Sequence, residues 1–186
     1  MKMKIRIILV IGVLSLSLGC ASIGSSFIKL RPDFSDVPES ELRAAATAIE
    51  TAVVQEVREP QLGDFPGVVL DSPEIAQSLR TRAARYSLVK KFLASGHAVE
   101  QKNGTLKIIN SREYKKGTTP RERDQNALLV MGENQSRWAL YEGIAKASNW
   151  PSGALGAIQQ SFYEARVALL EPGVKYEDAD GNVAIK

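Results

Sequence analysis

The sequence is poor in the residues that most familiar active sites use. Cys20 is its one cysteine and His97 its one histidine among 186 residues. An intrachain disulfide is therefore excluded, and so is a zinc site built from several cysteines and histidines. The sequence also lacks the Gly-x-Ser-x-Gly and His-Glu-x-x-His motifs and a glycine-rich phosphate loop. We therefore expect no metal, no cofactor and no enzymatic activity.

A strong excess of one charge is also absent. The chain has 24 lysines and arginines against 21 acidic residues, with a net charge of +3, and 44% of its residues are hydrophobic, as in ordinary globular proteins. Lys2, Lys4 and Arg6 account for the basic excess, because residues 1–19 contain no acid. Without that segment the chain is neutral and has no general attraction to polyanions. We expect no nucleic-acid partner.

Residues 1–19 have the organisation of a bacterial signal peptide. A basic start precedes an apolar run over 7–18, which is shorter than the roughly 20 residues of a membrane-spanning helix. The sequence Leu-Ser-Leu-Gly-Cys at 16–20 resembles a lipobox, with Ser17 where leucine is most common. This resemblance implies cleavage before Cys20 and acylation of that residue by chains such as palmitate, and several chains give a stable anchor.

The sequence after Cys20 predicts the location and the domain organisation. Ala21, rather than aspartate, follows the cysteine, which favours the periplasmic face of the outer membrane. Residues 20–35 are expected to form a lipidated tether, and residues 36–186 a single globular domain. The expected membrane contact is made through the lipid on Cys20.

Four segments of this domain are expected to be helical, at about 38–59, 73–95, 120–148 and 151–171. Asp36 is a possible N-cap of the first, and Pro60 is expected to end it. Ser72 with Pro73 starts the second and Gly96 ends it, while Thr119 to Glu122 form a capping box for the third. The intervening segments 61–71 and 111–119 are expected to be loops.

Two turn signals predict a small amount of strand. Asn103-Gly104 lies between two short runs and favours a hairpin with a type I′ turn. Asp180-Gly181 in the tail 174–186 is typical of a second turn, so a short strand or hairpin is expected there. The expected fold is a mainly helical α+β domain with about four helices and one or two short β-hairpins.

The helix expected at 120–148 carries polar residues on the face that should be buried. Asn134, Arg137 and Tyr141 lie within about 60° of one another at 100° per residue. Buried arginine and asparagine side chains need hydrogen-bond partners. This face is either a recognition site or an internal network that fixes helix packing, with Arg166 as a further member. The acidic residues form no defined pair in the sequence, and Glu133 is among those that look scattered.

Three further features are each open to a functional and a plain interpretation. The basic segment 111–124 either contacts anionic lipid headgroups or is a solvated loop. The apolar seams of the helices at 38–59 and 151–171 either line a groove for an acyl chain or form the core. His97, directly after Gly96, is expected to cap the helix end. The basic residues of the first feature are Arg112, Lys115, Lys116, Arg121 and Arg123.

Two segments together resemble the YdbL-like family of small bacterial envelope proteins, which carry a domain of unknown function. Residues 96–106 have the pattern Gly-x-x-x-Glu-x-x-Asn-Gly-x-Leu, with Thr105 in place of an aromatic residue. Residues 134–145 have the pattern Asn-x-x-Arg-x-x-x-Tyr-x-x-Ile-Ala. The resemblance covers 79–186, and the segment 111–124 is longer than the family pattern.

This resemblance implies a non-enzymatic accessory or chaperone role in envelope phospholipid transport or assembly. The implied partners are an AsmA-like envelope protein or a small companion lipoprotein. The face of Asn134, Arg137 and Tyr141, with the hairpin at Asn103 and Gly104, is expected to shape the docking surface. The alternative function is a lipoprotein that binds a lipid or another amphiphile in a groove between helices.

Overall fold

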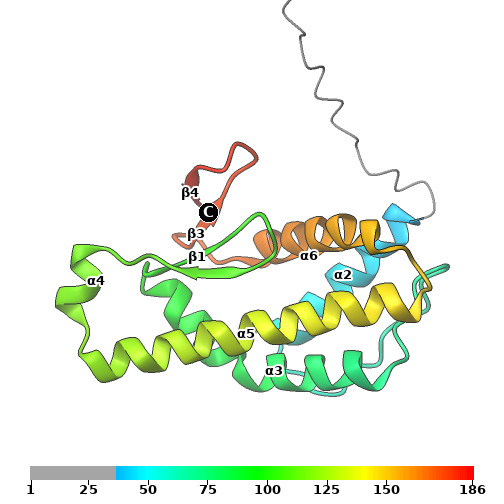
Figure 1. The fold of residues 1–186 in the computed structure, drawn as a ribbon, viewed down its shortest axis with the longest axis horizontal. Coiled ribbons are helices and arrows are strands. Elements are labelled where there is room, and N and C mark those ends of the chain that lie inside the picture. Colours follow the sequence, from blue (N-terminus) through cyan, green and yellow to red (C-terminus); the bar gives the residue numbers. More distant parts are fainter. Residues whose placement is uncertain (1–36) are drawn as a thin grey trace, which may run out of the picture. The chain divides into compact units, whose positions relative to one another are not determined.

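The computed structural model describes residues 37–186 (Figure 1). The predictions for the signal peptide, for Cys20, for the tether and for an N-cap at Asp36 fall outside these residues. The helices are α2 (Glu39–Val54), α3 (Pro73–Ala94), α4 (Arg112–Gly117), α5 (Pro120–Ala147) and α6 (Leu155–Leu169), with a 3-10 turn η1 (Ser152–Ala154). The strands are β1 (Ala98–Glu100), β2 (Leu106–Ile108), β3 (Lys175–Glu177) and β4 (Val183–Ile185). The predicted mainly helical α+β fold is confirmed.

The starts of the two longest helices follow their capping residues. Ser72 Oγ accepts a hydrogen bond from the backbone N–H of Ile75 at 3.2 Å, and Pro73 is the first residue of α3. Thr119 and Glu122 form the predicted capping box at the start of α5. Both predicted starts are confirmed, because each depends on a capping interaction between residues that are close in the sequence.

The end predicted for the first helix is wrong. It ends at Val54 rather than at Pro60, because Glu56 adopts a left-handed φ of 59°. The backbone N–H of Val57 then donates to Ala52 O, and that of Glu56 donates to Val53 O, both within 3.0 Å. These two bonds make a Schellman motif, which usually has glycine where this chain has Glu56. The sequence therefore carried no signal for this end.

The segment 111–119 is not the loop that was expected, since it contains the short helix α4. Ser111 Oγ accepts from the backbone N–H of Tyr114 at 3.1 Å and caps this helix. Tyr114 anchors it, because its side chain is buried against Phe92. The long insertion thus has a structure of its own (Figure 1).

The four strands form one sheet in the order β2-β1-β3-β4. The predicted hairpin is present, with Glu100 opposite Leu106, and the tail forms a second hairpin whose strand β3 runs parallel to β1. The expected type I′ turn is wrong. Gly104 has a φ of 83°, but Asn103 does not enter the left-handed region. The turn is closed by bonds from Gln101 N to Thr105 O and from Gly104 N to Gln101 O, which gives a longer loop with one left-handed residue.

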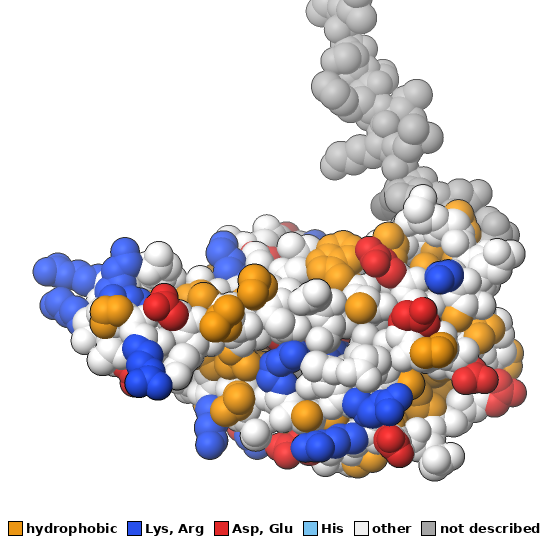
Figure 2. Space-filling model, turned by 60° about the horizontal axis from the view of Figure 1, so that its bottom comes forward, with side chains coloured by type: hydrophobic (Ala, Val, Ile, Leu, Met, Phe, Trp, Pro, Cys, Tyr) orange, Lys and Arg blue, Asp and Glu red, His pale blue; other side chains and the backbone are white. Residues whose placement is uncertain are grey.

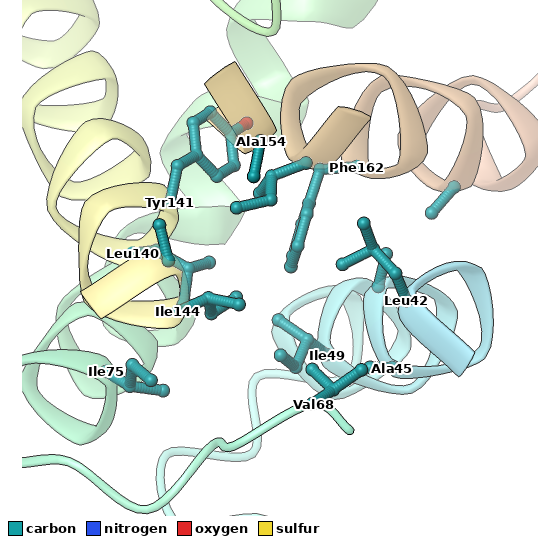
Figure 3. Packing of buried hydrophobic residues seen from close by; sticks show 14 of the residues in the cluster. Leu42, Ala45, Ile49, Val68, Ile75, Leu140, Tyr141, Ile144, Ala154 and Phe162 are labelled. Atoms are coloured by element: carbon teal, nitrogen blue, oxygen red, sulfur yellow. The ribbon is translucent and has the colours of Figure 1, made fainter. Parts of the chain in front are cut away.

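The hydrophobic core consists of two clusters. The larger one lies among α2, α6 and the facing parts of α3 and α5. In Figure 3, Leu42 and Ile49 of α2 point into the same core as Phe162 and Ile144. The apolar seams of α2 and α6 therefore cover each other, so they form core and not a groove. The smaller cluster joins the end of α3 to β1, β2 and α4. No helix within 37–186 is long and apolar enough to cross a membrane.

Candidate functional site

Six charged side chains are buried together in the interior. Each residue exposes 6% or less of its surface. They come from five different elements, which are α2, α3, β1, α5 and α6. Three are acids and three are arginines, so their formal charges cancel. The six are Glu50, Arg82, Glu100, Glu133, Arg137 and Arg166.

The first half of this cluster joins α2, α3 and α5 through Arg82. Its Nη1 and Nη2 atoms donate to the two carboxylate oxygens of Glu50 at 2.9 and 2.8 Å. Its Nε donates to Glu133 Oε1 at 2.9 Å. The second carboxylate oxygen of Glu133 accepts from the partly exposed Arg85 at 3.2 Å. One arginine thus holds two carboxylates from two helices.

The second half joins α5 to the sheet and to α6. Arg137 Nε donates to Glu133 Oε1 at 2.8 Å, and its two Nη atoms donate to Glu100 at 2.7 and 2.8 Å. Arg166 Nε donates to Glu100 Oε2 at 3.2 Å, and its Nη1 donates to Glu50 Oε1 at 3.0 Å. Because this last bond returns to Glu50, the contacts close on themselves. Among these six, each residue contacts two of opposite charge, and we refer to them as the charge ring.

The charge ring is covered by Tyr141 and the turn at Gly104. Tyr141 Oη accepts from Arg166 Nη1 at 2.9 Å and donates to Gly104 O at 3.2 Å. Arg166 Nη2 donates to the same carbonyl at 3.1 Å. A Cβ on Gly104 would lie 3.2 Å from Tyr141 Oη, so a glycine is required both by this close approach and by its positive φ. The predicted hairpin is therefore placed directly over the charges.

Asn134 attaches the same hairpin to α5. Its Nδ2 donates to Leu106 O at 2.9 Å, and its Oδ1 accepts from Leu106 N at 2.8 Å. Leu106 lies on the edge strand β2, where an amide side chain can take the place of a neighbouring strand. Asn103 lies in the exposed part of the turn, where its Oδ1 accepts from the backbone N–H of Thr105 at 3.1 Å.

The pKa shifts follow from the pairing within the ring. Burial alone would raise the pKa of Glu100, but the guanidinium groups of Arg137 and Arg166 outweigh burial and lower it. Glu133 behaves in the same way, since Arg82 and Arg137 hold its pKa far below its usual value despite burial. Both carboxylates are therefore ionised at neutral pH, and the same pairing raises the pKa values of Arg82 and Arg137 against the effect of burial.

The arrangement is suited to holding elements together. Within 37–186 every buried side-chain nitrogen and oxygen has a hydrogen-bond partner. The cavity beside the ring is about 30 Å³, which is room for water rather than for a substrate. The described residues contain no group of three or more ligands that would hold a metal ion. The charge ring thus links five elements of the fold, and its charges are neutralised by one another.

The sequence located part of this site and missed its acids. Arg137, Tyr141, Arg166 and Gly104 meet as one network, while Asn134 and Asn103 lie at its border. The sequence defined no acid–acid pair, and the structure instead places Glu50, Glu100 and Glu133 each against arginines. A signal was present in the spacing of Glu133 and Arg137, which are four residues apart on one helix. The other pairs depend on contacts between residues 32 or more positions apart.

The remaining predicted residues lie at the end of the fold that α4 forms. His97 does not cap α3, because the last carbonyls of the helix accept from the backbone N–H groups of Ser95 and Gly96 and from Ser95 Oγ. Its ring instead lies 5.2 Å from that of Tyr114. The basic residues of 111–124 lie on α4 and in the first turn of α5, and Figure 2 shows basic side chains gathered at this end. Arg123 is used internally, since its Nη1 donates to Thr118 O at 2.5 Å.

Comparison of the chain with protein-family models, with characterised proteins and with solved structures finds no match. The resemblance to the YdbL-like family therefore stays a prediction.

Proposed function

We propose that this chain is a non-catalytic lipoprotein of the outer membrane, anchored on the periplasmic face through acylated Cys20. Its role is that of an accessory or chaperone-like interaction protein in envelope phospholipid transport or assembly. An AsmA-like envelope protein or a small companion lipoprotein is the proposed partner. The lipobox-like sequence at 16–20 supports the anchor, and the YdbL-like segments support the role.

The observation that carries the proposal is the self-pairing of the charge ring. Arg137 and Tyr141 expose 1% and none of their surface, so they cannot touch a partner. A closed ring of matched charges leaves no free group for acid–base or nucleophilic chemistry. Its geometry suits a structural role, so the docking surface must be sought outside it.

The surface that best suits a partner is an apolar stripe on α5 beside the hairpin. Leu128, Met131 and Trp138 expose 62%, 61% and 37% of their surfaces. Met131 and Trp138 flank Asn134, which binds β2, and the Trp138 ring lies 6.1 Å from that of Tyr141. The charge ring therefore fixes the position of α5, the helix that presents this stripe. Exposed apolar residues of this kind are typical of docking surfaces.

Crosslinking in cells tests the docking surface. The tagged full chain is crosslinked, purified from outer membranes and analysed by mass spectrometry. We expect an AsmA-like protein or a companion lipoprotein with the parent chain, and loss of that partner with Met131→Glu. Ile185→Glu is the matched control, because Ile185 is 65% exposed on β4. Capture that Met131→Glu does not reduce would contradict the proposal.

Labelled palmitate tests the anchor separately. Cys20→Ala should abolish incorporation of the label and release the protein from the outer-membrane fraction, because no other cysteine is present. Incorporation that survives this substitution would exclude Cys20 as the acylated residue.

Amphiphile binding is a second candidate function, favoured by one observation. The groove expected between the helices at 38–59 and 151–171 is filled by their own side chains. An open hollow instead lies between α3, α4 and the start of α5, and its wall is partly apolar. This hollow is where an amphiphile would be accommodated.

A further inference from the structure

The hollow beside α4 has the dimensions of a ligand site. Its volume is about 680 Å³, within the range of roughly 300–1,000 Å³ that is usual for small-molecule sites. Leu88 and Phe92 of α3 form one wall, and Tyr114 of α4 with Leu129 of α5 form another. Leu88 is 55% exposed, so a ligand in the hollow would cover an apolar side chain that now contacts water. We refer to this site as the α4 hollow.

The walls of the α4 hollow are held in place by contacts of their own. Tyr114 is only 3% exposed, and its Oη accepts from Asn126 Nδ2 at 3.1 Å. Arg123 Nη1 donates to the carbonyls of Lys115 and Thr118 at 3.3 and 2.5 Å, which fixes the end of α4. The short helix is thus tied to α5 through Tyr114 and through its C-terminal end.

A lysine supplies the charge of the lining. Among the residues of 37–186 that line the hollow, Lys91 is a cation and none is a carboxylate, although the acidic Glu113 lies nearby in the first turn of α4. Lys91 forms no salt bridge with any residue of 37–186, although the neighbouring Lys90 pairs with Glu171 at 2.6 Å. The last turn of α4 adds two exposed lysines. An apolar wall beside an unpaired cation is complementary to a ligand with an apolar body and an anionic head.

We propose that the α4 hollow binds a single-chain anionic amphiphile of the fatty-acid class. The chain would lie against Leu88, Phe92 and Leu129, with its carboxylate next to Lys91. A single chain is favoured because the rest of the lining is polar, with Ser95, Thr118, Gln125 and Asn126 among it. A diacyl lipid has more apolar surface than this wall covers. The inference deepens the second candidate function and rests on it, but it requires no protein partner.

A photoreactive fatty acid tests the site directly. The full chain, as cells process it, is purified in mild detergent, placed in phosphatidylcholine nanodiscs and irradiated with diazirine-bearing decanoic acid. Peptide mapping should place the label on the peptides of the hollow, around Leu88 to Phe92 and around Tyr114 to Leu129. Unlabelled decanoate should compete about tenfold better than decanol, because a charge-assisted contact is worth about that factor. Equal competition by decanol would overturn the role of Lys91.

Two variants and a matched control complete the experiment. Leu88→Glu and Lys91→Gln should each lower labelling by about fivefold or more, since the first replaces an apolar contact of the acyl chain with a charged carboxylate and the second removes the cation beside the anionic head. Val183→Glu should not lower it, because Val183 is similarly exposed, at 57%, but lies on β4 outside the lining. Thermal unfolding confirms that all three fold. Labelling that is unchanged by Leu88→Glu, or that maps only to the stripe on α5, would overturn the inference. Failure to capture a protein partner in the crosslinking experiment would not, because the hollow requires no partner.

Discussion

The charge ring and the α4 hollow use charged residues in opposite ways. In the ring each arginine contacts two glutamates, and the group is buried and closed. In the hollow a lysine stands beside apolar side chains without a carboxylate in the lining. The charge ring therefore holds elements of the fold together, whereas the α4 hollow has a cation without an ionic partner among the described residues and apolar side chains that contact water. This difference teaches that the more conspicuous cluster of charges is the less suitable place for a ligand.

The largest expected effect comes from opening the ring. Arg137→Met keeps much of the side-chain volume but removes the cation between Glu100 and Glu133. Two buried carboxylates then lose a partner each, and a broken buried pair typically costs about 3–5 kcal/mol. The free energy of unfolding, measured by urea denaturation, should fall by that amount. The control is Arg43→Met, because the pair of Arg43 with Glu39 is solvent-exposed and should contribute less than about 1 kcal/mol. Equal losses in both variants would contradict the closed ring.

Acid should weaken the ring next. The pKa values of Glu100 and Glu133 are lowered in the folded state from an ordinary value of 4.5. A carboxyl group of this kind stabilises the fold fully above its unfolded pKa, and the stabilisation is lost as the pH falls toward the folded pKa. Stability should therefore be level between pH 7 and about pH 5 and should decrease below about pH 4.5.

Urea denaturation at several pH values measures this dependence. Glu133→Gln lowers stability at pH 7, but it should also make the decrease below pH 4.5 shallower, because one titrating group is gone. Glu164→Gln is the control, since that carboxylate is half-exposed on α6. An unchanged acid slope in Glu133→Gln would mean that Glu133 is not held ionised by its arginines.

Most of the secondary structure follows from local residues, and each of the two exceptions has an identifiable physical reason. The starts of α3 and α5 lie beside Ser72 and Thr119, whose side chains bond to the first turn. The end of α2 is set by a left-handed glutamate, Glu56, which no residue preference indicates. The helix α4 depends on burial of Tyr114 against a distant helix, so its sequence looks like a polar loop.

In the candidate site too, the residues that local spacing relates could be predicted, and those related by distant contacts could not. The spacing of Asn134, Arg137 and Tyr141 on one helix was enough to predict a buried polar face. Arg137 finds a partner four residues away in Glu133, but its other partner, Glu100, is 37 positions away on β1, and Glu50 and Arg166 are 116 positions apart. Helical periodicity does not reveal such pairs, and the positive edge of the α4 hollow is equally non-local because α3 supplies Lys91.

A smaller effect is expected where the turn covers the ring. Gly104→Ala must place a Cβ 3.2 Å from Tyr141 Oη at a φ of 83°, so it should lower the free energy of unfolding by about 2–4 kcal/mol. Gly181→Ala is the matched control, because Gly181 has a φ of 85° but nothing within 4 Å of the added atom. It should cost only about 1–2 kcal/mol. Urea denaturation of both variants separates the backbone cost from the contact with Tyr141. Equal losses of unfolding free energy in the two variants would mean that the turn at Gly104 is not packed against Tyr141.

The smallest effect on stability is expected in the hollow. Lys91→Gln removes a charge that has no ionic partner within 37–186 and that lies next to another lysine. The free energy of unfolding should change by less than about 0.5 kcal/mol in urea denaturation without added ligand. A loss above 1 kcal/mol would mean that Lys91 is part of the fold, as Arg137 is. A lysine that contributes nothing to the fold and yet controls labelling by decanoate has its role in binding. The contrast with Arg137 would then be complete, because there the charge holds the fold and is inaccessible to any ligand.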